Sequence, residues 1–194
     1  AIIFIAASLG TQNFLTAYNL TNILKQCAII GIISIAETYV IITAGIDISC
    51  GAIVGMSTLI VAMSQAKWGL SVPVSLLLGI LVAIISGVFN AALVYEFRVP
   101  AFVATLGSQT ILRGLIKVIS NGGTVAGINK SFAGFASASV GFIPNLAIVW
   151  FVIAVICFLI LKYTIFGRNS SALGSPQHAA TPTRTSPRPP LHSP

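Results

Sequence analysis

The residues that could do chemistry are few, and they lie inside or beside long apolar runs. The 194 residues include three acidic side chains, of which Glu37 falls within an apolar segment and Asp47 between two of them. Ionisable groups are costly inside a membrane and normally face a cavity or a partner. Asp47 therefore marks either a pathway-lining or gating element or a helix N-cap, with Asp47 or Ser49 accepting backbone N–H bonds. The two interpretations are compatible.

The sequence around Asp47, TAGIDISCGA, places Gly45 and Gly51 on either side of it. Glycine permits a tight turn, so a broken helix is expected here, with its irregular backbone facing protein or water. The functional interpretation makes Gly45, Asp47, Ser49 and Gly51 one element.

Other polar side chains lie within the apolar segments that follow Asp47 in the sequence. Arg113 and Lys117 are four residues apart, hence on one helical face, and either pair with Glu37 or Asp47 or extend to the membrane surface. Asn90 is expected to hydrogen-bond a neighbouring helix, which favours a packing role over contact with substrate.

Motifs of soluble enzymes are missing from the sequence. It has no GxxxxGK[ST], HExxH or GxSxG pattern, and its first histidine is His178. The three cysteines form no CxxC pair. We therefore expect no catalytic residues, no cofactor and no metal site.

Composition indicates the solvent in which this chain folds. Hydrophobic residues make up 56% and charged residues 7%, against about 25% charged in soluble domains. The net charge of +7 is attributed to membrane loops and lipid headgroups, without a nucleic-acid partner. Segments long enough to cross a bilayer predict an all-α, polytopic transmembrane helical bundle with about five full spans. These spans are residues 27–44, 48–66, 70–95, 101–119 and 144–162.

The remaining segments are shorter or polar. An apolar run at 1–9 predicts a partial N-terminal helix, residues 11–26 predict an interfacial helix, and 120–143 predicts a long surface loop. Residues 1–168 hold the apolar mass and form the predicted transmembrane domain, which we expect to be partial. Residues 169–194 contain six of the nine prolines and predict a disordered tail, which a frameshift would also explain.

Four stretches together resemble one family. They are NLTNILKQ (19–26), ETYVIITAGIDISCGAIVGMS (37–57), VPAFVATLGSQTILRGLI (99–116) and FGRNSSALGS (166–175). In order and spacing they resemble the membrane permease subunits of bacterial ABC importers of the ribose, xylose and galactose class. The resemblance covers roughly residues 12–174 and is lost after Gly174. Because the chain also opens inside an apolar run, we expect it to be truncated at both ends. The matching positions proposed as functional are Gly45, Asp47, Ser49, Gly51, Thr105 and Arg113, then Gly167, Arg168, Asn169, Ala172 and Gly174.

The resemblance implies a multi-pass protein of the bacterial plasma (inner) membrane that forms a translocation pathway for a monosaccharide. It implies ATP hydrolysis on separate ABC ATPase subunits, a periplasmic or lipid-anchored sugar-binding protein, and a second permease copy. The last matching stretch would be part of the cytoplasmic loop that docks on the ATPase, with 96–100 on the same side. Two alternatives stay open: an ion- or proton-coupled carrier that uses Glu37, Asp47 and Arg113, and a permease fragment that transports nothing.

Overall fold

A computed structural model describes residues 9–11 and 14–174 of the chain, apart from the Leu173 side chain. The elements in these residues are helices joined by short connections, with one two-stranded hairpin. They are α2 (Ala17–Ile42), α3 (Cys50–Ala66), α4 (Val72–Tyr95), α5 (Ala101–Ser120), α6 (Lys130–Ser137), β1 (Ser139–Val140), β2 (Ile143–Pro144), α7 (Asn145–Tyr163) and α8 (Ile165–Leu173).

The helices confirm the predicted all-α polytopic membrane protein. Within the described residues, α2, α4, α5 and α7 are long and apolar enough to cross a membrane. The fifth predicted span, at 48–66, is the apolar helix α3 of 17 residues. Each predicted span thus corresponds to a helix, and α3 is the shortest of them.

Helix α2 begins earlier than the hydropathy pattern predicted. It runs without interruption for 26 residues from the N-cap Thr16, whose hydroxyl accepts the Asn19 N–H. The predicted separate interfacial helix at 11–26 is therefore wrong from Ala17 onward, where it is the first part of the span. Amphipathic spacing and membrane-spanning hydropathy share the helical period, so the boundary between them left no signal in the sequence.

The two ends of the chain are described only in part. Of the predicted helix at 1–9, all but Leu9 lies outside the described residues. The predicted boundary at residue 168 falls inside α8, so residues 169–173 are helical and not the start of a disordered tail. Residues 175–194 lie outside the described part.

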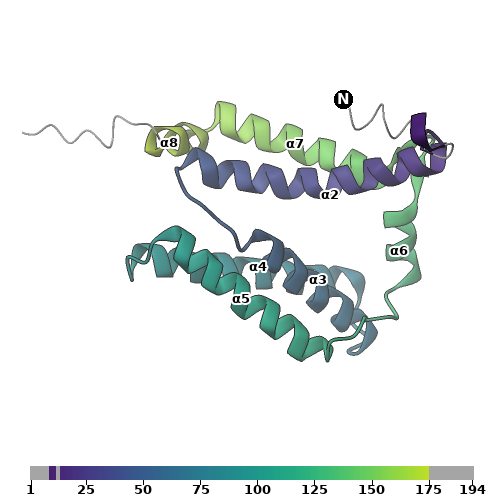
Figure 1. The fold of residues 1–194 in the computed structure, drawn as a ribbon, viewed down its shortest axis with the longest axis horizontal. Coiled ribbons are helices and arrows are strands. Elements are labelled where there is room, and N and C mark those ends of the chain that lie inside the picture. The colour runs from purple at the N-terminus through teal and green to yellow at the C-terminus, as the bar shows by residue number, and fades with distance from the viewer. Residues whose placement is uncertain (1–8, 12–13, 175–194) are drawn as a thin grey trace, which may run out of the picture.

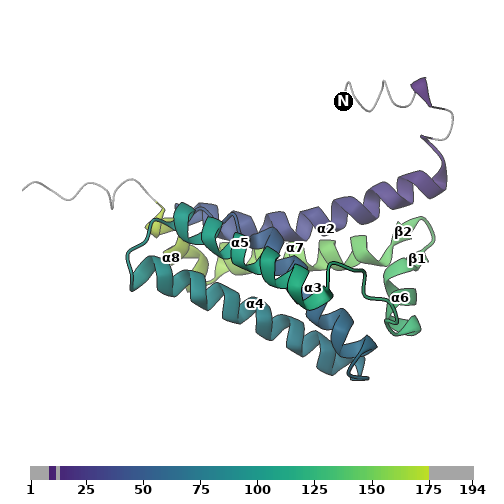
Figure 2. The same cartoon turned by 60° about the horizontal axis from the view of Figure 1, so that its bottom comes forward.

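The helices form two layers joined at their ends (Figure 1). One layer is the bundle, made of α3, α4 and α5, in which α3 packs against both other helices. The other layer is the pair, made of α2 and α7 side by side, with α8 packed against its end. A 60° rotation keeps α2 and α7 adjacent and shows α4 and α5 side by side within the bundle (Figure 2).

Most of the buried apolar side chains belong to the bundle. Met56, Leu59 and Met63 of α3 form a core cluster, against which Val82 of α4 and Leu112 of α5 pack. Close contact between α3 and α4 depends on Gly79, since a Cβ there would lie 2.5 Å from a methyl carbon of Val61. Small residues of this kind let membrane helices approach closely.

The pair buries fewer side chains between its helices. In α2 the buried residue is Ala28, and α7 has none among the described residues. The indole of Trp150 on α7 packs against Gly31 of α2, where a Cβ would overlap the ring.

The predicted surface loop at 120–143 contains the short helix α6 and the hairpin. The sequence did not reveal them because both are short and rich in small residues. This segment joins the layers: the Asn129 N–H donates to Gln65 Oε1 of α3 at 3.1 Å, and Lys25 Nζ of α2 donates to the Ser137 carbonyl at 2.9 Å.

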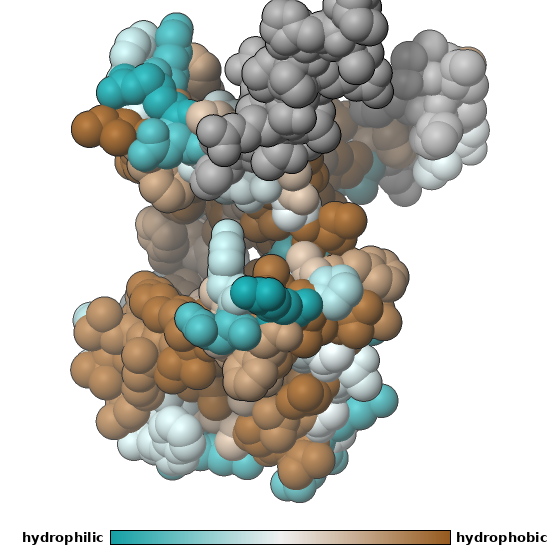
Figure 3. Space-filling model, turned by 90° about the vertical axis from the view of Figure 1, so that its left-hand side faces the viewer, coloured by the Kyte–Doolittle hydropathy of each residue, from teal (hydrophilic) through white to brown (hydrophobic). Residues whose placement is uncertain are grey.

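The outer surface is apolar over both layers. Seen from the α8 end, apolar side chains cover the flanks of the bundle, and polar side chains gather in smaller patches (Figure 3). In α4, Leu77, Ile80 and Val88 are more than half exposed. Such an exposed apolar face would cause aggregation in water, whereas it is stable in contact with the lipid chains of a membrane.

Candidate functional site

The site begins at the interruption between α2 and α3, residues 43–49, which we call the break. Helix α2 ends when Thr43 Oγ1 donates to the Val40 carbonyl and Ala44 adopts a left-handed conformation with φ of 57°. Gly45 then passes close to α2, because a Cβ there would lie 3.0 Å from a Val40 methyl carbon. The predicted break in the helix around Asp47 is present.

Asp47 orders the last residues of the break. Its Oδ1 accepts the Ser49 N–H at 2.7 Å and the Ser49 hydroxyl at 2.6 Å. Ser49 is the N-cap of α3, yet its own side chain makes no capping bond. The carboxylate therefore accepts a backbone N–H just before the helix and orients the hydroxyl of the N-cap residue. Its role in lining or gating a pathway stays a prediction.

The Ser49 hydroxyl starts a chain of buried hydrogen bonds across the bundle. Asn90 Nδ2 of α4 donates to Ser49 Oγ at 2.8 Å, and the Ser108 hydroxyl of α5 donates to Asn90 Oδ1. Ser49 is fully buried, and Asn90 and Ser108 are 7% and 4% exposed. We call Asp47, Ser49, Asn90 and Ser108 the polar ladder. Each bond uses one donor and one acceptor, so the ladder joins the break to α4 and α5 with its hydroxyl and amide groups satisfied.

An open cavity of about 420 Å³ lies beside the ladder at the break. We call it the break cavity. Its lining comes mainly from the break, from α4 and from α5, and includes Gly45 and the polar side chains of Thr43, Asp47, Asn90 and Thr105. Thr105 is 4% exposed and donates its hydroxyl to the Ala101 carbonyl of its own helix. Four of the residues singled out from the sequence thus meet at one cavity.

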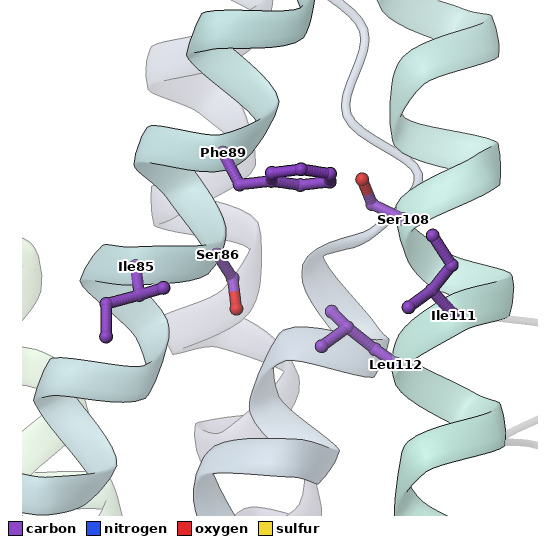
Figure 4. A pocket seen from close by; sticks show the side chains of 6 residues that line it. All are labelled: Ile85, Ser86, Phe89, Ser108, Ile111 and Leu112. Atoms are coloured by element: carbon purple, nitrogen blue, oxygen red, sulfur yellow. The ribbon is translucent and has the colours of Figure 1, made fainter.

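A second cavity, of about 190 Å³, lies between α4 and α5 and is called the α4–α5 cavity. In Figure 4 the ring of Phe89 points from α4 toward Ser108 on α5, and Ile85, Ile111 and Leu112 supply apolar walls. Asn90 lines the break cavity and Ser108 lines the α4–α5 cavity. The hydrogen bond between Asn90 and Ser108 therefore stands between the two cavities.

Three residues predicted to lie on the substrate pathway, Gly51, Glu37 and Arg113, belong neither to the polar ladder nor to the lining of these cavities. Gly51 is in the first turn of α3, and a Cβ there would meet nothing within 4 Å. Glu37 lies on α2, within electrostatic range of the Cys50 thiol at the start of α3. Arg113 lines a separate surface cavity with Gln109, Thr110 and Lys117 on α5. It is eight residues beyond Thr105, about 12 Å along the helix, so the structure does not place it with Asp47.

Helix α8 carries the residues that the resemblance assigns to ATPase docking, and it has two faces. Arg168, Asn169 and Ala172 are exposed. Spacings of one and four residues place these three on one side of a helix. They form an outward surface on α8.

The opposite side of α8 turns inward. Gly167 and Ser170 are buried, and Thr164 caps the helix by accepting the Gly167 N–H. A Cβ at Gly167 would overlap the Leu161 backbone of α7, and one at Gly174 would overlap the Ile42 carbonyl of α2. The two glycines are thus sites of close backbone approach.

Sequence reasoning missed Ser108 and Tyr39. Ser108 is three residues after Thr105 on the same buried face of α5, so the i, i+3 spacing of small polar residues was an available signal. Tyr39 donates its hydroxyl to the Cys157 carbonyl of α7, and its ring stacks on Phe166 of α8 with centroids 6.2 Å apart. A lone tyrosine in an apolar run carries no signal for such a partner.

No group of three His, Cys, Asp or Glu side chains that could hold a metal occurs among residues 9–11 and 14–174. The ladder is a hydrogen-bonding arrangement, in which the hydroxyl and amide groups of Ser49, Asn90 and Ser108 follow the Asp47 carboxylate.

Comparison with known proteins decides the family. Residues 19–182 match the family described as the permease component of branched-chain amino acid transport systems. The chain belongs to this permease family. The match includes the break, the polar ladder and α8, so these features lie within the region that matches a family of membrane permease components.

Curated relatives include three sugar permeases. The chain is 34% identical over 182 residues to the ribose import permease protein RbsC of Bacillus subtilis (strain 168), covering 92% of this chain and 56% of the relative. It is 34% identical to the D-allose transport system permease protein AlsC of Escherichia coli (strain K12), covering 92% and 55%. It is 32% identical to the xylose transport system permease protein XylH of Haemophilus influenzae, covering 79% and 42%. The chain spans about half the length of these relatives, and no solved structure gives a significant match.

Proposed function

We propose that this chain forms part of the translocation pathway of an ATP-driven ABC importer for a monosaccharide. The observation that carries the proposal is the hydrogen bond between Asn90 and Ser108, two uncharged groups that face neighbouring cavities within the bundle. A sugar presents many hydroxyl groups, each able to donate and to accept. Side chains that do the same, such as those of Asn90 and Ser108, can exchange hydrogen bonds with it.

The names of the relatives support a sugar as the solute, but they differ in which sugar they name. Their names include ribose, D-allose and xylose, and also autoinducer 2 in the import permease protein LsrC of Salmonella typhi. The proposed partners are ABC ATPase subunits, a substrate-binding protein outside the membrane, and a second permease copy. The proposed location is the bacterial inner membrane, with α8, the break and residues 96–100 on the cytoplasmic side.

The exposed residues of α8 fit the docking role. Arg168, Asn169 and Ala172 project from a helix in which Gly167 and Gly174 allow close approach to α7 and α2. We infer that they contact the ATPase, while Gly167 and Gly174 fix the position of α8.

Uptake of labelled ribose, xylose and allose into membrane vesicles tests the proposal, with the ATPase and binding protein co-expressed. Uptake should require ATP inside the vesicles and persist when an uncoupler removes the proton gradient. Asn90→Leu should reduce uptake strongly, whereas Thr110→Val, an exposed hydroxyl on α5, should leave it near wild type. Uptake that needs no ATP and collapses with the uncoupler alone would show an ion-coupled carrier and overturn the proposal.

A further inference from the structure

We propose that Tyr39 and Gly174 are positioning residues that transmit the movement of α8 to the break and, through Asp47, to the polar ladder. The inference rests on the proposed function, because it assigns a route to the docking helix of that importer. It goes beyond it by naming the contacts through which α8 acts on the pathway.

The first step is the attachment of α8 to the end of α2. Phe166, near the start of α8, stacks on Tyr39, three residues before α2 ends. Gly174, the C-cap of α8, lies against the Ile42 carbonyl and the Ala44 N–H, where the break begins. The two contacts hold both ends of α8 to the same stretch of backbone, so a displacement of α8 moves the last turn of α2.

The second step is the attachment of Tyr39 to the pair. Its hydroxyl donates to the Cys157 carbonyl on α7. The same side chain thus touches α2, α7 and α8, and fixes the angle at which α8 meets the other two helices.

The third step carries the movement into the bundle. The break is short, and its far end is held by the two Asp47 hydrogen bonds to Ser49. Ser49 is fully buried and holds Asn90, so it cannot shift without changing a hydrogen bond that faces the break cavity. The near end of the break is therefore held by α8 and the far end by the ladder.

Native cysteines supply reporters at the two ends of this route. Cys50 is the first residue of α3, directly after the break, and is partly exposed, while Cys27 is exposed on the distant half of α2. Two single-cysteine forms of the chain, one with Cys50 and one with Cys27, are labelled with N-ethylmaleimide in membranes. Gly174→Ala is introduced into each, with Gly87→Ala as the matched control because a Cβ at Gly87 meets nothing within 4 Å.

Gly174→Ala should change the labelling rate of Cys50 by about tenfold and leave that of Cys27 unchanged, and Gly87→Ala should alter neither. Unchanged Cys50 labelling would overturn the inference. If the labelling rates of both cysteines change, Gly174→Ala has disturbed the fold, and Phe166→Ala is introduced into the same two forms instead. A changed labelling rate at Cys50 alone then supports the route, and any other result overturns it.

A second readout separates transmission from simple stability. In the complete importer, Tyr39→Phe keeps the ring and removes the bond to Cys157, so uptake per ATP hydrolysed should fall severalfold while hydrolysis continues. An equal fall in both would indicate a structural role only and overturn the assignment of Tyr39. Cysteine labelling requires no transport, so wild-type vesicles without ATP-driven uptake would contradict the proposed function and leave the labelling result standing.

Discussion

The bundle and the pair are built from equally apolar helices, yet they hold together in different ways. The bundle has a core of methionine and leucine side chains and three hydrogen-bonded polar residues buried between its helices. The pair has one fully buried residue, a tryptophan packed on a glycine and one tyrosine hydroxyl between helices. Hydropathy therefore determines which segments enter the membrane, while small and polar residues determine which of them pack tightly.

The difference gives each region a distinct role in the proposed importer. The bundle carries the groups that face the cavities, and the pair carries the helix proposed to meet the ATPase. They are joined at one end by the break and at the other by the segment around α6. Substitutions that separate the two kinds of packing test this comparison.

Asn90→Leu should have the largest effect on stability. It removes both hydrogen bonds of Asn90 and leaves the Ser108 hydroxyl without its partner, a loss of about 1–3 kcal/mol. Thermal unfolding in detergent measures it. Thr58→Val is the control, since Thr58 is an exposed hydroxyl of α3 that bonds only within its own helix. Equal melting temperatures for the two variants would mean that the ladder does not stabilise the bundle.

Gly79→Ala should have the second-largest effect and lower the free energy of unfolding by about 1–2 kcal/mol through overpacking. Its Cβ would meet the Val61 methyl carbon and lie 3.4 Å from the Ser57 carbonyl oxygen, so α3 and α4 must separate. Gly87→Ala on the same helix has open space and should be neutral or slightly stabilising. The difference in detergent melting temperature between them measures the tightness of the bundle, and no difference would contradict close packing there.

Gly31→Ala tests the same kind of contact in the pair and should cost less than Gly79→Ala. The three atoms nearest to a Cβ at Gly31 all belong to the Trp150 ring, whereas those at Gly79 include the Ser57 backbone. A side chain can shift more readily than a backbone can, so a movement of the ring relieves part of the overlap. A loss of stability equal to or larger than that of Gly79→Ala would show that the pair is packed as tightly as the bundle.

Tyr39→Phe should have the smallest effect on stability, about 0.5–1.5 kcal/mol for one hydrogen bond between helices. Tyr95→Phe is the matched control, because Tyr95 is 80% exposed at the end of α4. The free energy of unfolding of each variant, obtained from denaturant titration, gives the difference. If Tyr95→Phe lowers the free energy of unfolding as much as Tyr39→Phe does, the hydrogen bond between Tyr39 and Cys157 does not stabilise the pair.

The sequence predicted the spans and the break better than the contacts between them. Twenty apolar residues fold as a helix in lipid whatever their neighbours are, since backbone groups must be satisfied internally. The glycines around Asp47 similarly predicted the irregular backbone that the structure contains at residues 43–49. Helix α3, whose glycine and serine residues dilute its hydropathy, also appeared at its predicted position.

Pairings between helices depend on how each helix is rotated about its axis, and hydropathy does not report rotation. Arg113 illustrates this: its charge suggested a partner in Glu37 or Asp47, but it lies on another face and another turn of α5. Ser108 illustrates the converse, because a serine within an apolar helix looked unremarkable until Asn90 was seen to face it. The family resemblance identified Gly167 and Gly174, and the structure adds the physical reason, which is close approach to other backbones.

The distance between spin labels tests the central claim that a rigid bundle and a looser pair meet at the break. In a cysteine-free background, one pair of labels replaces Lys67 and Lys117 at the end of the bundle, and another replaces Gln26 of α2 and Lys117; all three positions are exposed. Electron–electron double resonance in lipid should give a narrow distance distribution for 67 and 117 and a broader one for 26 and 117. Equally narrow distributions would show one rigid block and contradict the account.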